Sequence, residues 1–256
     1  ATYGIDVLGS RQGSWLLRRA RIPHRHGVRG YAGGDNWCET CVPFREDRNV
    51  AQAALAFLPL LGVKSPPQVE PRPRLVLSEA EKTEAEDRWG NRSCTDSLHI
   101  VLAPGAGFPE KSWGNENFSR LAYLLLERTQ HQLVVLGGAE DTERIAARNT
   151  TETSDRLANH CGSLSLRQSA AMVAKADFVL TNTTVTMHFA GAFRIPSITL
   201  LGPWYDSAKL HAKQWGYPES QVLGPEKAEG RIAPLSPEEA FDTFVERAQQ
   251  LPALAS

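Results

Sequence analysis

From residue 98 onward the sequence alternates short apolar segments with amphipathic ones, and this rhythm restricts the fold more than any other feature. The expected strands are His99–Ala103, Gln132–Leu136, Phe178–Thr181 and Ser197–Leu201. The spacing of apolar residues predicts helices at Glu116–Arg128, Asp141–Arg148, Leu166–Ala176, Thr186–Phe193 and Pro237–Gln250. Continuous apolar strands that alternate with amphipathic helices are typical of a parallel sheet with helices on both faces. The predicted fold class is therefore α/β.

The first part of the chain is shorter and less regular. Its expected elements are a strand at Gly4–Leu8, a helix near Ser14–Ala20, a basic loop at Ile22–Gly34 and a helix at Asn49–Leu61. Four prolines in Val63–Arg74 favour an extended connector, and Ser78–Trp89 reads as a polar helix with a capping pattern at its start. Because 256 residues are a tight fit for two domains, we expect a partial N-terminal domain (1–75), a connecting helix (76–91) and a complete C-terminal domain (92–256).

Composition excludes several classes of protein. The net charge of −1 provides no overall basic field, which disfavours a nucleic-acid partner. The longest apolar stretch, Ala53–Val63, is too short to cross a bilayer and contains Pro59. The sequence begins at Ala1 without the features of a secretory signal, so we expect a cytoplasmic protein whose numbered chain starts inside a gene product. The four cysteines, too scattered for a disulfide framework, are Cys38, Cys41, Cys94 and Cys161.

Polar and small residues follow the expected strands, where a parallel sheet binds ligands. After the first strand, residues 105–107 are small, so backbone N–H groups can approach an anionic oxygen, and Lys111 can supply a positive charge. A flexible turn with a solvated lysine is the alternative. After the second strand, Glu140 could accept hydrogen bonds from the hydroxyls of a ribose. Alternatively, its negative charge could simply stabilise the start of a helix through the helix dipole.

The segment after Phe178–Thr181 predicts an anion site. Four hydroxyl or amide side chains, at positions 182, 183, 184 and 186, are expected to cap the helix that follows. His188 lies early in this helix, where it could donate to a phosphate or pack in the interior. Since these loops share one rim of one sheet, they favour a nucleotide-like ligand.

Four segments, taken in order, carry a resemblance to a known family. They are PGAGFPEKSW, LGGAED, CGSLSLRQSAAMVAKADFVLTN and TTVTMHFAGAFRIPSITLLGP, and GIDVLGSRQGSWLLRRARIPHRHGVRG near the start supports them. Together they resemble glycosyltransferase family 9, the ADP-heptose:lipopolysaccharide heptosyltransferases. The resemblance implies a GT-B fold, in which two Rossmann-like parallel-sheet domains face a cleft, with the N-terminal one incomplete in this chain. It also implies a nucleotide sugar held mainly by the C-terminal domain, with no cofactor and no metal.

The resemblance assigns donor-binding roles residue by residue. Phosphate contacts fall on Ala106, Gly107 and Lys111, the ribose contact on Glu140 and the adenine contact on Leu164. Contacts to the diphosphate or the sugar fall on Thr183, Thr184, Val185 and His188. The chain departs from the family motif at Thr183, where the family has Asp, and at Val185, where it has Gly. A β-branched residue does not easily adopt the positive φ that Gly allows, so we expect weaker or altered phosphate binding.

The family's catalytic Asp lies in the first loop of its N-terminal domain. About 60 to 80 residues of that domain, at about 30 to 40 per βα unit, have no counterpart here. Asp6 follows a different strand, so we assign no catalytic base.

Two functions from different classes remain. The first is a glycosyltransferase that moves a heptose, or a similar sugar, from an ADP-sugar to a lipopolysaccharide inner-core acceptor with inversion. The second is a non-catalytic nucleotide-sugar-binding or scaffold homologue.

Two features of the first part of the chain each have two interpretations. The basic residues between Arg18 and Arg29 either contact lipid A and core phosphates at the inner-membrane surface or form a solvated loop. Cys38 and Cys41 are either zinc ligands or surface thiols, and a single Cys-x-x-Cys pair favours thiols.

Overall fold

The computed structural model describes residues 1–64, 70, 72–91, 94, 96–142 and 154–251 of the chain. It divides into two compact units. Unit 1 comprises Ala1–Pro71 with Lys213–Trp215, and unit 2 comprises Arg72–Ala212 with Gly216–Ser256. Each unit contains its own parallel sheet. The boundaries expected from the sequence, at residues 75 and 92, stay a prediction.

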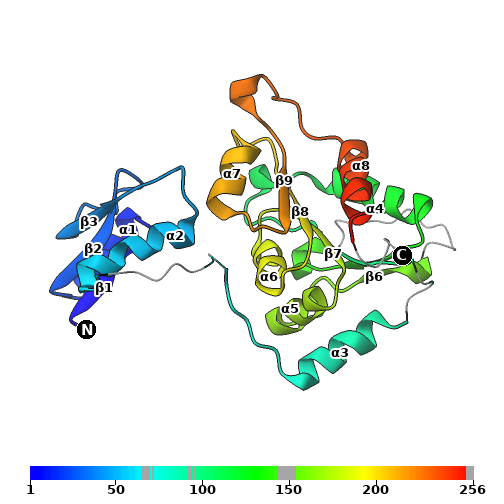
Figure 1. Ribbon diagram of the computed structural model, residues 1–256, viewed down its shortest axis with the longest axis horizontal. Coiled ribbons are helices and arrows are strands. Elements are labelled where there is room, and N and C mark those ends of the chain that lie inside the picture. Colours follow the sequence, from blue (N-terminus) through cyan, green and yellow to red (C-terminus); the bar gives the residue numbers. More distant parts are fainter. Residues whose placement is uncertain (65–69, 71, 92–93, 95, 143–153, 252–256) are drawn as a thin grey trace. The chain divides into compact units, whose positions relative to one another are not determined.

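Unit 2 is built on a six-stranded sheet in which every neighbouring pair of strands is parallel (Figure 1). In chain order the strands are β4 (His99–Ala103), β5 (Gln132–Val135), β6 (Leu157–Asn159), β7 (Phe178–Thr181), β8 (Ser197–Leu200) and β9 (Ser220–Leu223). Their spatial order is β6-β5-β4-β7-β8-β9. The chain runs outward from β4 to β6 and then returns to β7 on the other side of β4. A crevice is therefore expected between β4 and β7, at their carboxyl ends.

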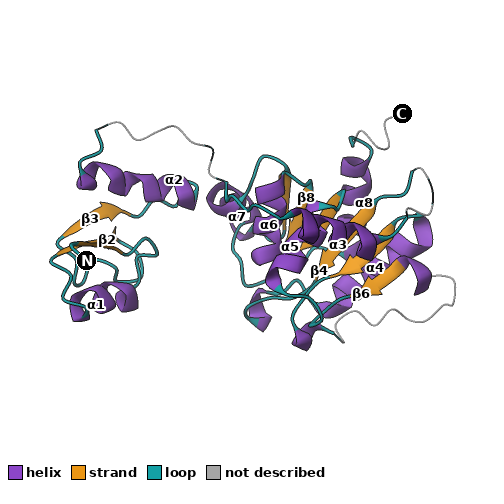
Figure 2. Ribbon diagram, turned by 90° about the horizontal axis from the view of Figure 1, so that it is seen from below, coloured by secondary structure: helices purple, strands orange, loops and turns teal. Residues whose placement is uncertain are grey.

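Helices cover both faces of this sheet (Figure 2). They are α3 (Glu79–Trp89), α4 (Asn115–Arg128), α5 (Leu166–Ala174), α6 (Val185–Phe193), α7 (Ala208–Trp215) and α8 (Pro237–Ala248). α4 packs against α8, whereas α5 packs between α3 and α6. The central strand β4 serves both cores, because Ile100 and Leu102 join the cluster around α4 and α8 and Val101 joins the cluster around α3 and α5. The predicted parallel sheet with two covered faces is confirmed.

Local signals in the sequence explain where several helices begin. Ser78 caps α3, and Glu81 completes a capping box with it. Ser165 and Ser236 cap α5 and α8 in the same way. At the other end of α3, the Trp89 ring stacks on His99, with ring centroids 4.4 Å apart. The connecting helix is thereby anchored to the first strand of the sheet.

Unit 1 is a three-stranded parallel sheet with a small core. Its elements are β1 (Tyr3–Ile5), α1 (Arg11–Arg19), β2 (His24–Arg29), β3 (Thr40–Pro43) and α2 (Val50–Ala54), which continues into a 3₁₀ helix (Leu55–Leu61). The buried core residues are Val28, Val42 and Phe57. The prediction of a loop at Ile22–Gly34 is wrong, because β2 lies within it. Strand pairing on both sides of β2 outweighs the basic residues and glycines that suggested a loop.

Other differences between the predicted and the observed helices and strands have equally local causes. The expected helix Asn49–Leu61 changes to 3₁₀ geometry before Pro59, whose ring nitrogen cannot donate a helical hydrogen bond. The expected helix Asp141–Arg148 begins only as a 3₁₀ turn, Ala139–Asp141, and most of its remainder lies outside the described residues. Strands β6 and β9 and helix α7 had no strong sequence signal, since the strands are short and partly exposed. None of the helices in the described part of the chain combines the length and apolar character needed to cross a membrane.

Candidate functional site at the carboxyl edge of the large sheet

Five loops meet the carboxyl ends of strands in unit 2. We call them the β4 loop (residues 104–114), the β5 loop (136–141), the β6 loop (160–165), the β7 loop (182–184) and the β8 loop (201–207). Because all strands are parallel, these loops leave the sheet at the same edge. The β4 and β7 loops follow the two neighbouring strands at which the strand order reverses. They contain most of the residues expected to contact a ligand.

Asn182 connects the β7 loop to the β4 loop. Its side chain is fully buried. Nδ2 donates hydrogen bonds to the carbonyl oxygens of Pro104, at 2.7 Å, and Gly105, at 3.2 Å. Oδ1 accepts a hydrogen bond from the backbone N–H of Trp113 at 3.0 Å. The expectation that Asn182 helps to cap the next helix is therefore wrong, because its amide binds both ends of the β4 loop instead.

Asp141 brings the β4 and β5 loops together. Its carboxylate is buried and accepts a hydrogen bond from the Gly138 N–H at 2.8 Å. A Cβ at Gly105 would lie 2.5 Å from Asp141 Oδ2, and one at Gly137 would lie 2.6 Å from it. A side chain at either position would therefore displace the Asp141 carboxylate. Glu140, the acid expected to contact a ligand, is exposed and lies beside Gly138.

The β6 loop packs against the β5 loop. Gly162 has a φ of +70°, and its N–H donates a hydrogen bond to the Gly137 carbonyl at 3.0 Å. A Cβ at Gly162 would lie 2.7 Å from the Ala139 Cα. Leu164, the expected adenine contact, is half-buried and packs against the core beneath α5. The loop thus offers a small apolar surface beside the exposed Glu140.

Lys111 lies between two exposed aromatic rings. Its Nζ is 4.4 Å from the centre of the Trp204 ring and 5.2 Å from that of the Phe108 ring, both distances typical of cation–π contacts. The N–H of Gly202 donates to the Lys111 carbonyl at 3.3 Å, which joins the β4 and β8 loops. Among the described residues, no acidic side chain pairs with Lys111.

The small residues before Lys111 leave space at the same rim. Gly107 is exposed, and a Cβ built on it would meet no atom within 4 Å. Ala106 beside it is partly exposed. The geometry therefore allows a ligand to approach the backbone here, as the sequence predicts.

Helix α6 begins without a side-chain cap. Thr184 occupies the N-cap position, but its hydroxyl makes no capping hydrogen bond. The hydroxyl of Thr183 instead hydrogen-bonds to Nε2 of His211, at 2.9 Å. The expectation that these threonines cap the helix is therefore wrong. The N–H groups of the first turn, together with the helix dipole, favour an anionic ligand at this end.

Val185 is the first residue of α6 and is 44% exposed. The expectation that this position demands a positive φ is wrong, because Arg21 and Arg194 are the only non-glycine residues in the described part of the chain that have one. A β-branched residue adopts the helical conformation here without the expected backbone strain. Any effect of Val185 on a ligand must come from the volume of its side chain.

His188 faces a tyrosine that the sequence did not single out. Its Nδ1 lies 2.7 Å from the hydroxyl of Tyr217, and the two rings are nearly perpendicular. Burial lowers the pKa of His188, which favours the neutral imidazole. The contact links the first turns of α6 to the segment before β9.

A row of rings in the β8 loop and α7 joins Lys111 to Thr183. Trp204 contacts Tyr205, and Tyr205 contacts His211, each pair edge-to-face. His211 holds the Thr183 hydroxyl, as described above. Tyr205 and His211 were not predicted as site residues, because no helix was expected between the strand Ser197–Leu201 and the helix Pro237–Gln250. Ser207, which caps α7, was the available signal.

Two buried histidines give unit 2 a pH dependence. Burial lowers the pKa of both His131 and His211 to about 4, against an ordinary value of 6.5. Between these values the unfolded chain binds protons that the folded chain does not, so lowering the pH destabilises the fold. We expect the free energy of unfolding to fall between pH 7 and pH 5, by at most about 1.4 kcal/mol per pH unit for each histidine.

Urea unfolding at pH 7, 6 and 5 measures this dependence in a range above the ordinary pKa of carboxylates. His211→Gln should reduce the slope, because glutamine does not titrate. A slope that is unchanged in this variant would contradict the assignment to His211.

Unit 1 supplies no metal site within the residues described. No group of three or more His, Cys, Asp or Glu side chains there is placed to hold an ion. Cys38 and Cys41 are free thiols, and burial raises the pKa of Cys38 to about 11. Of the basic residues, Arg25 pairs with Glu39 at 3.0 Å, whereas Arg18 remains exposed.

A known family model matches most of this chain. The profile of glycosyltransferase family 9 (heptosyltransferase) matches residues 1–222. Lipopolysaccharide heptosyltransferase 2 of Salmonella typhimurium is 31% identical over 208 residues, and its Escherichia coli K12 counterpart is 30% identical over 194 residues. Each match covers 72% of this chain and 55% of the relative. The chain thus spans about half the length of these relatives.

Solved structures share the fold. The structure of E. coli ADP-heptose LPS heptosyltransferase II superposes with a TM-score of 0.70 at 23% identity, covering 97% of this chain and 76% of the other. E. coli heptosyltransferase WaaC with ADP superposes with a TM-score of 0.65 at 17% identity, covering 98% and 75%. At these identities the likeness establishes the architecture, an α/β fold with two parallel sheets of the GT-B type.

Proposed function

Because the chain belongs to glycosyltransferase family 9, we propose that unit 2 binds an ADP-sugar, such as ADP-heptose, at the carboxyl edge of its sheet. One observation carries the proposal: Lys111, which pairs with no acidic side chain among the described residues, and the uncapped start of α6 belong to the loops after β4 and β7, the neighbouring strands at which the strand order reverses. A diphosphate carries negative charge and accepts hydrogen bonds through its oxygens. Both features favour such a group.

In this proposal each loop meets a different part of the donor. The diphosphate contacts the backbone at Ala106 and Gly107 and the ammonium of Lys111. The first turn of α6 contacts the diphosphate or the sugar through Thr184, Val185 and His188. Glu140 is exposed and can accept hydrogen bonds from the ribose, and Leu164 offers an apolar contact to adenine. Thr183 has its hydroxyl bound by His211, so we assign it an indirect contribution at the same loop.

The proposed reaction is transfer of the sugar, with inversion, to an acceptor hydroxyl of the lipopolysaccharide inner core. It follows from the family and from the described activity of the relatives. A general base must remove the proton of the attacking hydroxyl. We assign this role to no residue of the chain.

On the acceptor side, we propose that basic residues of unit 1 contact lipid A and core phosphates at the cytoplasmic face of the inner membrane. Exposed Arg18 and Arg19 at the end of α1 support this part of the proposal. No cofactor or metal is required in this scheme, in which the ADP-sugar is the substrate.

A second candidate function is donor binding without transfer. It is favoured by the two departures from the family motif, since Thr183 is engaged with His211 and the Val185 side chain occupies the start of α6. An assay with ADP-heptose and a lipopolysaccharide inner-core acceptor separates the two functions. Release of ADP that depends on the acceptor supports transfer. Donor binding without ADP release supports the second function.

Lys111→Ala tests the donor site directly. We expect ADP to bind more weakly by about 1.5 to 3 kcal/mol, because a charge-assisted contact to the diphosphate is lost. Isothermal titration calorimetry with ADP measures the change. Lys82→Ala is the matched control, since Lys82 pairs with Glu79 on the exposed side of α3. Equal ADP affinity in wild type and Lys111→Ala would remove Lys111 from the site.

A further inference from the structure

We propose that Tyr217 is a positioning residue that holds the His188 imidazole in the tautomer protonated at Nε2. The inference deepens the donor site proposed above and rests on it for its functional meaning. Its structural part concerns only the folded chain without a ligand. It starts from the 2.7 Å contact between the Tyr217 hydroxyl and Nδ1 of His188.

The direction of this hydrogen bond follows from the partners available. A phenol can donate one proton, and a neutral imidazole has one nitrogen that donates and one that accepts. Among the described residues, no other group hydrogen-bonds to the Tyr217 hydroxyl. Donation from the hydroxyl to Nδ1 therefore satisfies the phenol proton, and it leaves the imidazole proton on Nε2.

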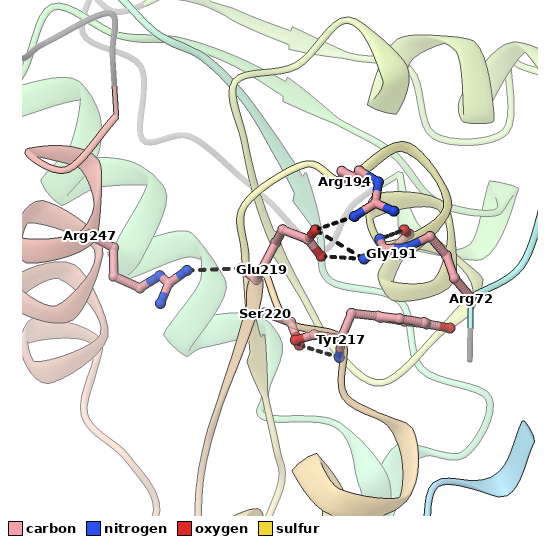
Figure 3. A network of polar contacts seen from close by, with 7 residues as sticks. All are labelled: Arg72, Gly191, Arg194, Tyr217, Glu219, Ser220 and Arg247. Atoms are coloured by element: carbon pink, nitrogen blue, oxygen red, sulfur yellow. Dashed lines mark hydrogen bonds and ion pairs between the residues drawn. The ribbon is translucent and has the colours of Figure 1, made fainter. Parts of the chain in front are cut away.

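Arg72 strengthens the tyrosine as a donor. Its guanidinium lies 5.8 Å from the centre of the Tyr217 ring, and its side chain is only 8% exposed. Both Glu219 oxygens accept from it, at 2.9 and 3.0 Å, and it also donates to the Gly191 carbonyl (Figure 3). A buried cation beside the ring makes the phenol proton easier to donate. Burial nonetheless raises the pKa of Tyr217, so the hydroxyl keeps its proton at neutral pH.

The ring of Tyr217 is fixed against α6 by a glycine. A Cβ at Gly191 would overlap the ring, with the Cγ atom 2.7 Å away. Gly191 lies three residues after His188, hence on the same face of the helix. The backbone N–H of Tyr217 donates to Ser220 Oγ at 2.9 Å, which holds the turn before β9 (Figure 3). The hydroxyl is therefore held at a defined position relative to His188.

The tautomer determines what the imidazole can offer an anion. Phosphate oxygens accept hydrogen bonds, so a ring protonated at Nε2 can donate to them from that nitrogen. A ring protonated at Nδ1 would present a lone pair from Nε2, which repels an anion. Because burial lowers the His188 pKa, the neutral ring depends on this tautomer for a favourable contact.

The tautomer is measured directly by ¹⁵N NMR of the histidine side chains in the ligand-free chain. His188→Gln identifies the His188 signals by their loss. We expect Nε2 to carry the proton and Nδ1 to show the shift of a nitrogen that accepts a hydrogen bond, a shift that changes in Tyr217→Phe. Protonation at Nδ1 in the wild type would overturn the proposal. This measurement needs no donor, so it stands even if the proposed function fails.

A double-mutant cycle tests the functional part with ADP as the probe. Tyr217→Phe should weaken ADP binding by about three- to tenfold in the wild-type background and cause no further loss in His188→Gln. Tyr123→Phe, which removes an exposed hydroxyl bonded to Glu127, is the matched control and should leave ADP affinity unchanged.

Other outcomes of the cycle are equally informative. Equal losses from Tyr217→Phe in both backgrounds would mean a general structural effect and would overturn the positioning role. If His188→Gln binds ADP as tightly as wild type, the His188 contact in the proposed function is refuted, and the positioning role with it. The NMR result then still decides the tautomer. Thermal unfolding of each variant verifies that it folds.

Discussion

Asn182→Leu is expected to lower the free energy of unfolding by about 3 to 5 kcal/mol, the largest effect that we predict for one side chain in the site. Leucine has the same branched side-chain skeleton as asparagine but cannot hydrogen-bond, and its two methyl groups are larger than the amide oxygen and nitrogen that they replace. The N–H of Trp113 and the carbonyl of Pro104 would lose buried partners, and each unsatisfied group costs about 1 to 3 kcal/mol. Urea unfolding measures the loss, and ADP titration is expected to show impaired binding because the β4 loop is released.

Asn117→Leu is the matched control for this prediction. Asn117 also donates to the backbone around Trp113, with a 2.7 Å hydrogen bond to its carbonyl, but it is only half-buried. We expect its replacement to cost about 1 kcal/mol, as for one ordinary hydrogen bond. Equal losses in the two variants would show that the buried Asn182 side chain contributes no more to stability than one ordinary hydrogen bond.

Gly202→Ala is the second large effect expected. An added methyl would overlap the carbonyl oxygen of Ser112 and lie 2.9 Å from the carbonyl carbon of Lys111. These are backbone atoms, which cannot turn away as a side chain can. We expect a loss of about 2 to 4 kcal/mol in unfolding free energy. We also expect weaker ADP binding, because the segment that carries Lys111 must move.

The comparison variant for stability is Gly107→Ala. At that position an added Cβ meets no atom within 4 Å, so the unfolding free energy should stay nearly constant. If Gly202→Ala unfolds at the same urea concentration as the wild type, the loop must adapt at little cost. The close packing of the β4 and β8 loops would then not be needed to hold Lys111.

The sequence was most informative where burial and hydrophobic pattern coincide. Strands β4 and β7 were predicted with their observed bounds, because both are fully buried apolar runs. The capping pattern at Ser78 located the start of α3. Strand β2 was hidden because His26 and Gly27 at its buried centre are not typical strand residues.

The position of the candidate site was also predictable, since ligands bind beyond the carboxyl ends of parallel strands. The contacts that hold the loops together could not be predicted from the sequence. Asn182 contacts Trp113, which lies 69 positions away in the sequence, and Tyr217 contacts His188 across 29 positions. Periodicity and capping motifs report on neighbours within one element. They contain no information on pairs that only the folded chain brings together.

The packing of Asp141 against Gly105 and Gly137 has a consequence for protein engineering. The three positions behave as one module, since neither glycine can gain a side chain while the carboxylate occupies its place. Grafting the β4 loop of another member of the family onto this scaffold must therefore transfer the matching β5 loop as well. In a library that varies either loop alone, few variants with a side chain at residue 105 or 137 will fold. A library that exchanges both loops together keeps its folded members.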